Sequence, residues 1–178
     1  MKVITGKLKG KRLKGPKDIR PVTSMIKEAI FDTLSWVDWE EAFVLDLFCG
    51  VGNFGIEAIS RGAKYVVFID KSKDSANFVK KNLENIEFHG KIIVSDFRKA
   101  IKNLFKKNEK FNIIFADPPF DLLLGNEIIR CLEKYDILAQ GGLLVLRIRD
   151  KEELKINDRW QSEKRKYGDS VVYYLKRI

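Results

Sequence analysis

Residues 43–55 read FVLDLFCGVGNFG, and this stretch decides the fold. Residues 43–48 predict a buried strand and residues 56–61 predict a helix, with a glycine-rich turn between them. Gly50, Gly52 and Gly55 match the spacing G-x-G-x-x-G, in which backbone approaches a ligand at the N-terminus of a helix. The stretch therefore predicts the first strand, ligand turn and helix of a doubly wound α/β sheet.

Strands and helices alternate around this stretch. We expect helices over residues 24–36, 74–86, 97–107 and 122–134, and strands over residues 65–69, 91–95, 111–116 and 142–148. Residues 159–166 and 171–176 predict a hairpin that ends the sheet. The chain has 178 residues, 45% of them hydrophobic, which suits one core. We expect one domain over residues 23–178, preceded by a small basic hairpin over residues 1–22.

Four successive predicted strands each carry an acid at or near their carboxyl ends: Asp46, Asp70, Asp96 and Asp117. In a doubly wound sheet these ends share one rim, where ligands bind. Asp70 follows Gly50 by twenty residues, a position from which an acid can accept hydrogen bonds from both ribose hydroxyls. Asp46 would repel a pyrophosphate but attract an ammonium group, which favours S-adenosylmethionine over NAD. Asp96 could accept the adenine amino group, cap the helix that follows, or do both.

The run Asp117-Pro118-Pro119-Phe120 directly after the strand 111–116 indicates chemistry on a flat amine. A carboxylate and a backbone carbonyl can each accept one N–H and so orient the nitrogen lone pair. Proline fixes its own φ, which holds the Pro118 carbonyl rigidly, and Phe120 offers a face on which a base can stack. The alternative is that the two prolines only end the strand and begin a turn.

Charge is concentrated at the two ends of the chain. The formal net charge is +9, of which residues 1–20 carry +7 and residues 147–178 carry +4, leaving −2 for the 126 residues between them. Basic segments beside a nearly neutral core are typical of a protein that holds a polyanion. The alternative is a solvated tail, but apolar residues and glycines interleave with the N-terminal lysines, which favours a structured arm that binds RNA or DNA.

The sequence gives little support to a membrane, secreted, metal-binding or disulfide-rich protein. No apolar run approaches the about 18 residues of a membrane helix, and no signal segment is evident, so we expect a cytoplasmic protein. His89 is the only histidine, and Cys49 and Cys131 have neither the number nor the spacing of a metal site or a disulfide framework. We therefore expect no metal and two reduced cysteines.

On these motifs the chain resembles the RsmD family of bacterial 16S rRNA guanine-N2 methyltransferases, which are class I S-adenosylmethionine-dependent enzymes. The resemblance is carried by the basic segment 3–13, by Arg20-Pro21-Val22-Thr23 with the helix after it, by residues 46–52, by Asp117-Pro118-Pro119-Phe120 and by residues 167–170. Arg147 stands where relatives often carry an acid. The resemblance implies a Rossmann-like, mostly parallel seven-stranded sheet with helices on both faces, a C-terminal antiparallel hairpin and an N-terminal β-hairpin.

The motifs and the resemblance together predict three sets of site residues. The catalytic set is Asp117, Pro118, Pro119 and Phe120. The set for S-adenosylmethionine is Asp46, Phe48, Gly50, Gly52, Asn53, Asp70, Lys71, Asp96 and Phe97. The set for RNA is Lys7, Lys9, Lys11, Arg12, Arg20 and Thr23.

We expect a monomer that transfers a methyl group to N2 of a guanine in ribosomal RNA, within a small-subunit particle. The same tetrapeptide would suit an adenine-N6 DNA methyltransferase, although the chain has no room for a base-reading domain. A protein-glutamine methyltransferase is less favoured because Asn usually begins its motif. A non-catalytic RNA-binding module would have no need for the four acids at the strand ends.

Overall fold

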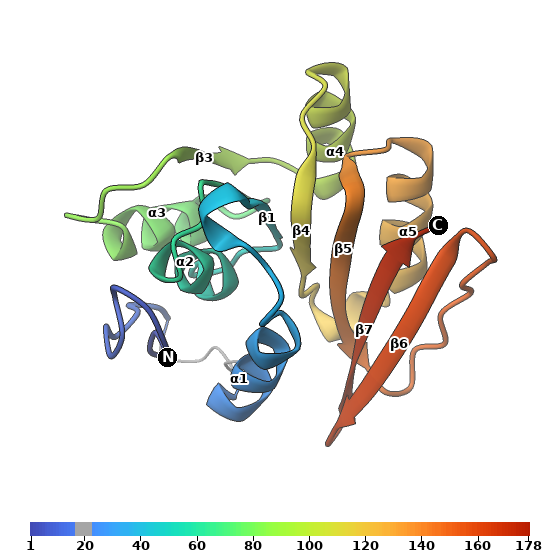
Figure 1. The fold of residues 1–178 in the computed structure, drawn as a ribbon, viewed down its shortest axis with the longest axis horizontal. Coiled ribbons are helices and arrows are strands. Elements are labelled where there is room, and N and C mark those ends of the chain that lie inside the picture. The colour runs from blue at the N-terminus through green and yellow to red at the C-terminus, as the bar shows by residue number, and fades with distance from the viewer. Residues whose placement is uncertain (17–22) are drawn as a thin grey trace.

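The computed structural model describes residues 1–16 and 23–178 (Figure 1). Its helices are α1 (Ser24–Thr33), α2 (Asn53–Ser60), α3 (Lys73–Asn82), α4 (Phe97–Lys106) and α5 (Gly125–Lys134), with short 3-10 turns η1 (Trp39–Glu41) and η2 (Phe120–Leu122). Its strands are β1 (Phe43–Leu47), β2 (Tyr65–Asp70), β3 (Gly90–Val94), β4 (Phe111–Ala116), β5 (Leu138–Arg149), β6 (Trp160–Tyr167) and β7 (Ser170–Arg177). Among the described residues, no helix is long and apolar enough to cross a membrane.

The strands form one seven-stranded sheet in the order β3-β2-β1-β4-β5-β7-β6. The first five strands in this order run parallel, and β7 and β6 add an antiparallel hairpin, as predicted. The strand order reverses between β1 and β4, which pair directly, with Val44 opposite Ile113 and Leu47 opposite Ala116. The ends of these two strands are therefore the switch point at which doubly wound sheets bind ligands.

Apolar residues line both faces of the parallel strands, so the sheet is buried between two layers of helices (Figure 1). Val44, Phe68 and Phe115 pack on the face covered by α1, α2 and α3. Their neighbours Leu45 and Val67 pack on the opposite face, which α4 and α5 cover. This strict alternation confirms the predicted layers and directs the side chain of each strand residue to a known face.

The N-terminal segment is a loop that folds back on itself as a minimal form of the predicted hairpin, with one antiparallel bridge, Lys2 with Arg12, and three backbone hydrogen bonds between residues 1–3 and 10–13. The bridge cannot extend because the segment directs its backbone N–H groups at α2. Ile4 and Thr5 donate to the two carboxylate oxygens of Glu57, at 2.8 and 3.0 Å. The division of the chain at residue 22 stays a prediction, and the loop packs Val3 and Leu13 into the same core as α1 and α2.

Predicted and observed boundaries differ by three or more residues at four helices, among them α3, which ends at Asn82, four residues before its predicted end. α1 ends at Thr33, three residues before the predicted end, and α2 begins at Asn53, three residues before the predicted start. α5 begins at Gly125 because Leu123 adopts a left-handed conformation (φ 46°), which separates η2 from α5. A continuous helix from residue 122 cannot pass through that backbone conformation.

Candidate active site

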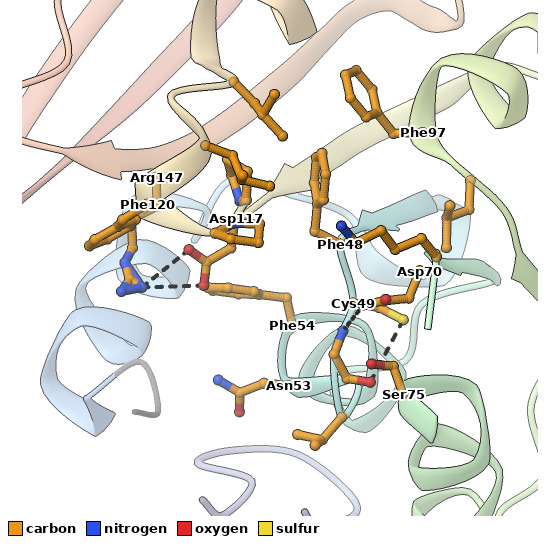
Figure 2. Close-up of a pocket in the computed structure, with 18 of the residues that line it drawn as sticks. Phe48, Cys49, Asn53, Phe54, Asp70, Ser75, Phe97, Asp117, Phe120 and Arg147 are labelled. Atoms are coloured by element: carbon orange, nitrogen blue, oxygen red, sulfur yellow. Dashed lines mark hydrogen bonds and ion pairs between the residues drawn. The ribbon is translucent and has the colours of Figure 1, made fainter. Parts of the chain in front are cut away.

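A cavity of about 1090 Å³ opens beyond the carboxyl ends of β1 to β4, where the four acids were expected (Figure 2). The predicted site residues that line it are Phe48, Gly50, Asn53, Asp70, Lys71, Asp96, Phe97, Asp117, Pro118, Pro119, Phe120 and Thr23. Those that do not line it are Asp46, Gly52, Lys7, Lys9, Lys11 and Arg12. The structure thus brings the tetrapeptide and most of the predicted cofactor residues into one space.

The turn after β1 has a backbone that only a few residue types tolerate. Gly52 precedes α2 with φ 86°, and Phe48 has φ 66° although it carries a bulky side chain. A left-handed conformation at such a residue is unusual and clusters at ligand sites. Gly55 has a different constraint, since a Cβ there would lie 2.2 Å from the ring of Phe68. The three glycines therefore set both the turn and the close packing of α2 on the sheet.

Asp46 lies beneath this turn instead of at the cavity surface. It is 2% exposed, and one carboxylate oxygen accepts the N–H of Gly55 at 2.8 Å. Burial raises the pKa of Asp46 to about 7, and the negative charges of Asp117 and Asp70 add to the rise. Asp46 therefore fixes the first turn of α2. It also places below the cavity a carboxyl group that becomes negatively charged as the pH rises through about 7.

Asp70 holds the two loops that frame the cofactor part of the cavity. One carboxylate oxygen accepts the N–H of Gly50 and the other accepts the N–H of Ser72, both at 2.9 Å. Both oxygens keep a second lone pair for another donor. The side chain is therefore fixed at the end of β2 with acceptor capacity left, which suits the predicted ribose contact.

Asp96 is the N-cap of α4, one of its two predicted roles. Its carboxylate accepts the N–H of Arg98 at 2.9 Å and also pairs with the Arg98 guanidinium at 2.8 Å. Next to it, the rings of Phe48 and Phe97 pack with centroids 5.1 Å apart. Arg98, which the sequence did not single out, lines the cavity as well and pairs with Glu127.

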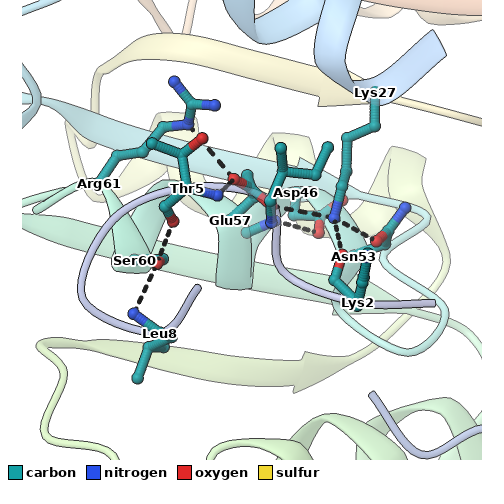
Figure 3. A network of polar contacts seen from close by, with 11 residues as sticks. Lys2, Thr5, Leu8, Lys27, Asp46, Asn53, Glu57, Ser60 and Arg61 are labelled. Carbon is teal, nitrogen blue, oxygen red and sulfur yellow. Dashed lines mark hydrogen bonds and ion pairs between the residues drawn. The ribbon is translucent and has the colours of Figure 1, made fainter. Parts of the chain in front are cut away.

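Asn53 presents a donor without a partner. The residue is 7% exposed, its Oδ1 accepts from Lys27 Nζ at 3.0 Å, and its buried Nδ2 has no hydrogen-bond partner within the described residues. Lys27 Nζ also contacts Glu57 at 3.0 Å and donates to the carbonyl of Lys2 at 2.8 Å (Figure 3). Burial lowers the pKa of Lys27, while Glu57 opposes the change. This buried network joins the N-terminal loop, α1 and the turn between β1 and α2 (residues 48–52), called the cofactor turn below.

The tetrapeptide forms the other side of the cavity. Asp117 follows β4, and its two carboxylate oxygens each lie 3.2 Å from Nη1 of Arg147 on β5 (Figure 2). The Arg147 guanidinium carbon lies 4.7 Å from the centroid of the Phe120 ring. Burial raises the pKa of Asp117 to about 6, against the opposing charge of Arg147. Asp117 is therefore a carboxylate at neutral pH that gains a proton only slightly below it.

The residues predicted to bind RNA lie in two places. Lys7, Lys9 and Arg12 are exposed on the N-terminal loop, and Lys11 is half-buried there. The loop packs along α2, and Lys7 N donates to the carbonyl of Ser60 at the C-terminal end of that helix, at 2.7 Å. Thr23 is the N-cap of α1, where its hydroxyl oxygen accepts from Ile26 N at 3.3 Å. Arg20 lies outside the described residues.

No group of three or more His, Cys, Asp or Glu side chains in residues 1–16 and 23–178 is arranged to hold a metal ion. Cys49 and Cys131 are free thiols. Burial strongly raises the pKa of the Cys49 thiol, and the nearby Asp46 adds to the effect, so this residue in the cofactor turn is a poor nucleophile.

Known proteins resemble this chain along nearly its whole length. Residues 1–176 match the model of a family described as conserved hypothetical protein 95. A putative rRNA methyltransferase, YlbH of Bacillus subtilis, is 32% identical over 99% of this chain and 100% of its own. Ribosomal RNA small subunit methyltransferase D of Escherichia coli is 30% identical over 98% of this chain and 88% of its own. The solved structure of a putative methyltransferase, YhhF of Escherichia coli, has a TM-score of 0.86 at 28% identity and covers 99% of this chain and 97% of its own.

Proposed function

The chain belongs to the RsmD family of methyltransferases, and from this premise we propose that it transfers a methyl group from S-adenosylmethionine to N2 of a guanine in 16S ribosomal RNA. The observation that carries the proposal is the single cavity shared by Asp117-Pro118-Pro119-Phe120 and the cofactor turn. One set of residues suits an amine and the other suits a methyl donor. Their common space allows the two reactants to meet.

The residues present fit S-adenosylmethionine. Asp70 would accept from the ribose, and Phe48 and Phe97 give the same region apolar walls. The free N–H of Asn53 Nδ2 and the N-terminus of α2 would bind the carboxylate of the methionine part. The negative charge of Asp46 favours the ammonium group, and Lys71 and Asp96 line the remaining edge. When bound, the cofactor supplies an electrophilic methyl group on a sulfonium.

The protein's own part in the reaction is to hold and orient the amine. The target base leaves its stack and lies against Phe120. The Asp117 carboxylate and the Pro118 carbonyl each accept one N–H, so the nitrogen lone pair points at the methyl group. The N–C bond forms as the S–C bond breaks, and the amine, now acidic, releases one proton to Asp117 or to water. Asp117 needs only to be ionised, which its pKa of about 6 allows at neutral pH.

The finer assignments follow from the family and from charge. We propose the small ribosomal subunit, at some stage of assembly, as the substrate particle, a monomer as the working form and the cytoplasm as its location. Lys7, Lys9, Lys11 and Arg12 on the N-terminal loop would bind RNA phosphates, together with Arg20. Thr23 lines the cavity and would contact the RNA at its entrance.

The direct test is to incubate the protein with labelled S-adenosylmethionine and, separately, small ribosomal subunits, deproteinised 16S rRNA and duplex DNA. Nucleoside mass spectrometry then identifies the product. We expect N2-methylguanosine from one of the two RNA substrates. A product of N6-methyladenine, or label on DNA alone, would refute the proposal.

Replacing Asp117 tests the mechanism within the same assay. We expect Asp117→Ala to lower kcat by about a hundredfold or more, the range in which a positioned proton-accepting group contributes. Calorimetry should give the same affinity for S-adenosylmethionine as the wild type, because Asp117 lies on the base side of the cavity. An unchanged kcat would remove Asp117 from the mechanism.

A further inference from the structure

Arg147 fills the space that the proposed function gives to the target base. Its side chain is 13% exposed and extends from β5 into the cavity, between the carboxylate of Asp117 and the ring of Phe120 (Figure 2). The sheet places it there, because Ala116 on β4 pairs with Leu146 on β5 and the next residues along these parallel strands are Asp117 and Arg147. The arginine thus donates to the same acid, and covers the same ring, as the base is expected to do.

The chemical structure of the Arg147 guanidinium indicates which nucleobase it resembles. A guanidinium is a planar carbon that bears three nitrogens and directs N–H groups from one edge. Guanine contains the same unit, since its C2 is bonded to N1, N2 and N3, with N–H groups on N1 and N2. The amino-bearing carbon of adenine is bonded to only two nitrogens, and its neighbouring ring nitrogen N1 accepts hydrogen bonds instead of donating them.

We propose that Arg147 is a placeholder for the amine edge of the target guanine, and that the base enters the site by displacing the guanidinium from Asp117 and Phe120. This inference rests on the proposed function and extends it. The slot that Arg147 occupies then favours guanine over other bases, because a slot that accommodates a guanidinium also accommodates the guanidine part of guanine.

The contacts that hold Arg147 in the site are weak, so its side chain can move away from Asp117. One nitrogen, Nη1, reaches both carboxylate oxygens at 3.2 Å, whereas a strong paired contact uses two nitrogens at about 2.7–2.9 Å. Its Nε is buried and has no hydrogen-bond partner among the described residues. A structural ion pair would use that donor, so the present arrangement is incomplete.

Guanosine binding tests the displacement without any RNA. Wild type, Arg147→Ala and Arg177→Ala are titrated with guanosine and with adenosine, with S-adenosylhomocysteine present to fill the cofactor part of the cavity. The readout is the carboxyl carbon resonance of Asp117. Arg177→Ala is the matched control, since it removes an arginine of the adjacent strand that pairs with Asp136 at 2.9 Å outside the cavity lining.

We expect Arg147→Ala to bind guanosine about two- to fivefold more tightly than the wild type, the range for releasing a modest ion pair. Adenosine binding and the Arg177→Ala protein should show no such gain. Equal guanosine affinity in the wild type and Arg147→Ala, weaker binding by the variant, or an equal gain for adenosine would each overturn the placeholder. Should Arg147→Ala fail to fold, Arg147→Gln, which keeps the length and loses the charge, replaces it.

Methyl-transfer kinetics separate this inference from the proposed function. Arg147 has already left Asp117 in the reactive complex, so Arg147→Ala should lower KM for RNA and leave kcat and its pH profile unchanged. A lower kcat would make Arg147 part of the reactive complex and overturn the placeholder. If the wild type makes no methylated guanine, the proposed function fails, and the guanosine titration still decides whether Arg147 yields to that base.

Discussion

At the scale of single residues, the two acids of the site whose pKa is raised differ in what their proton controls. Asp117 lies at the cavity surface and must be ionised to take up a proton from the amine, whereas Asp46 lies under the turn and is 2% exposed. Burial raises the pKa of Asp117 to about 6 and that of Asp46 to about 7. The first value bears on catalysis and the second on stability.

The pKa of Asp117 predicts the pH dependence of kcat/KM, which reports the free enzyme. The carboxylate is a stronger acceptor for an N–H than the protonated acid and can take up the proton that the amine releases, so kcat/KM should rise with pH through a midpoint at about 6 and then level off. Initial rates at subsaturating RNA between about pH 5 and about pH 8.5, on both sides of that midpoint, measure it. The residual activity of Asp117→Asn should lack this step, and a wild-type midpoint near the ordinary value of about 4 would contradict the assignment.

The pKa of Asp46 predicts a stability that falls as pH rises. The pKa is raised on folding from 3.8 to about 7, so the folded state holds a proton that the unfolded state has lost, and stability declines between these values. Asp46→Asn cannot lose that proton. Relative to the wild type, its free energy of unfolding should therefore be higher at about pH 8 than at about pH 5. Urea unfolding at both pH values measures the difference, and an equal offset at both would contradict it.

At the scale of elements, the N-terminal loop is joined to α1 and α2 through buried charge. Glu57 on α2 is fully buried, and Lys27 on α1 neutralises it while the loop supplies two N–H donors. Removing one member of such a set leaves the other charged and buried. The loop, the helix that begins the domain and the cofactor turn are therefore expected to lose order together.

Lys27→Met tests this linkage. We expect the free energy of unfolding to fall by about 3–5 kcal/mol, as when a buried pair loses one partner. Lys64→Met is the matched control, because Lys64 forms an exposed pair with Glu41 at 2.6 Å, and it should cost about 1 kcal/mol or less. The double variant Lys27→Met with Glu57→Gln should recover part of the loss. Equal effects of the two single variants would contradict a buried linkage.

The elements that sequence predicted best are those whose signals are local. β4 has the predicted bounds, 111–116, because an apolar run meets two prolines. The start of α2 was placed too late because Asn53-Phe54-Gly55 read as turn residues, although the left-handed Gly52 before them begins the helix. The N-terminal hairpin is shorter than predicted because the N–H groups of Ile4 and Thr5 bind a carboxylate on α2, which no local pattern reveals.

The site was predictable to the same extent. Asp70, Asp96 and Asp117 line the cavity as predicted because each stands at or just after a strand end, and strand ends share a rim. Asp46 lies one residue inside the end of β1 and so below the cavity. Arg147 had no assigned role because its contact with Asp117 depends on the pairing of β4 with β5, thirty residues apart. The structural role of Lys27 was not predicted. The spacing of apolar residues around it indicates only a helix, and nothing in the sequence shows that its side chain is buried beside Glu57.

At the scale of the whole molecule, positive charge outside the core is expected to govern how the RNA is held. Lys7, Lys9 and Arg12 are exposed on the N-terminal loop, which packs along α2. Phosphate contacts from such residues make binding depend on salt and carry no sequence information.

Replacing Lys7, Lys9, Lys11 and Arg12 together with Ala should weaken RNA binding and reduce its salt slope by about 0.7 for each phosphate that is no longer neutralised. Filter binding at several salt concentrations measures both. Lys99, Lys102, Lys106 and Lys107, four exposed lysines of α4 and its C-terminal end, provide a control with an equal change of charge on the opposite face. Affinity for S-adenosylmethionine should be unchanged in both proteins, and equally weakened RNA binding would mean that charge alone, not the loop, matters.

The direct pairing of β1 with β4 has a consequence for how the molecule is assembled. The chain supplies β1, the cofactor turn, β2 and β3 before residue 111, yet the second edge of β1 has no partner until β4 arrives. A product truncated before residue 111 would therefore expose the backbone of Val44–Leu47 as an open strand edge, which is a template for aggregation. The switch point that forms the cavity is also the junction that joins the two halves of the parallel sheet, so folding intermediates would hold the cofactor turn before they hold any place for the base.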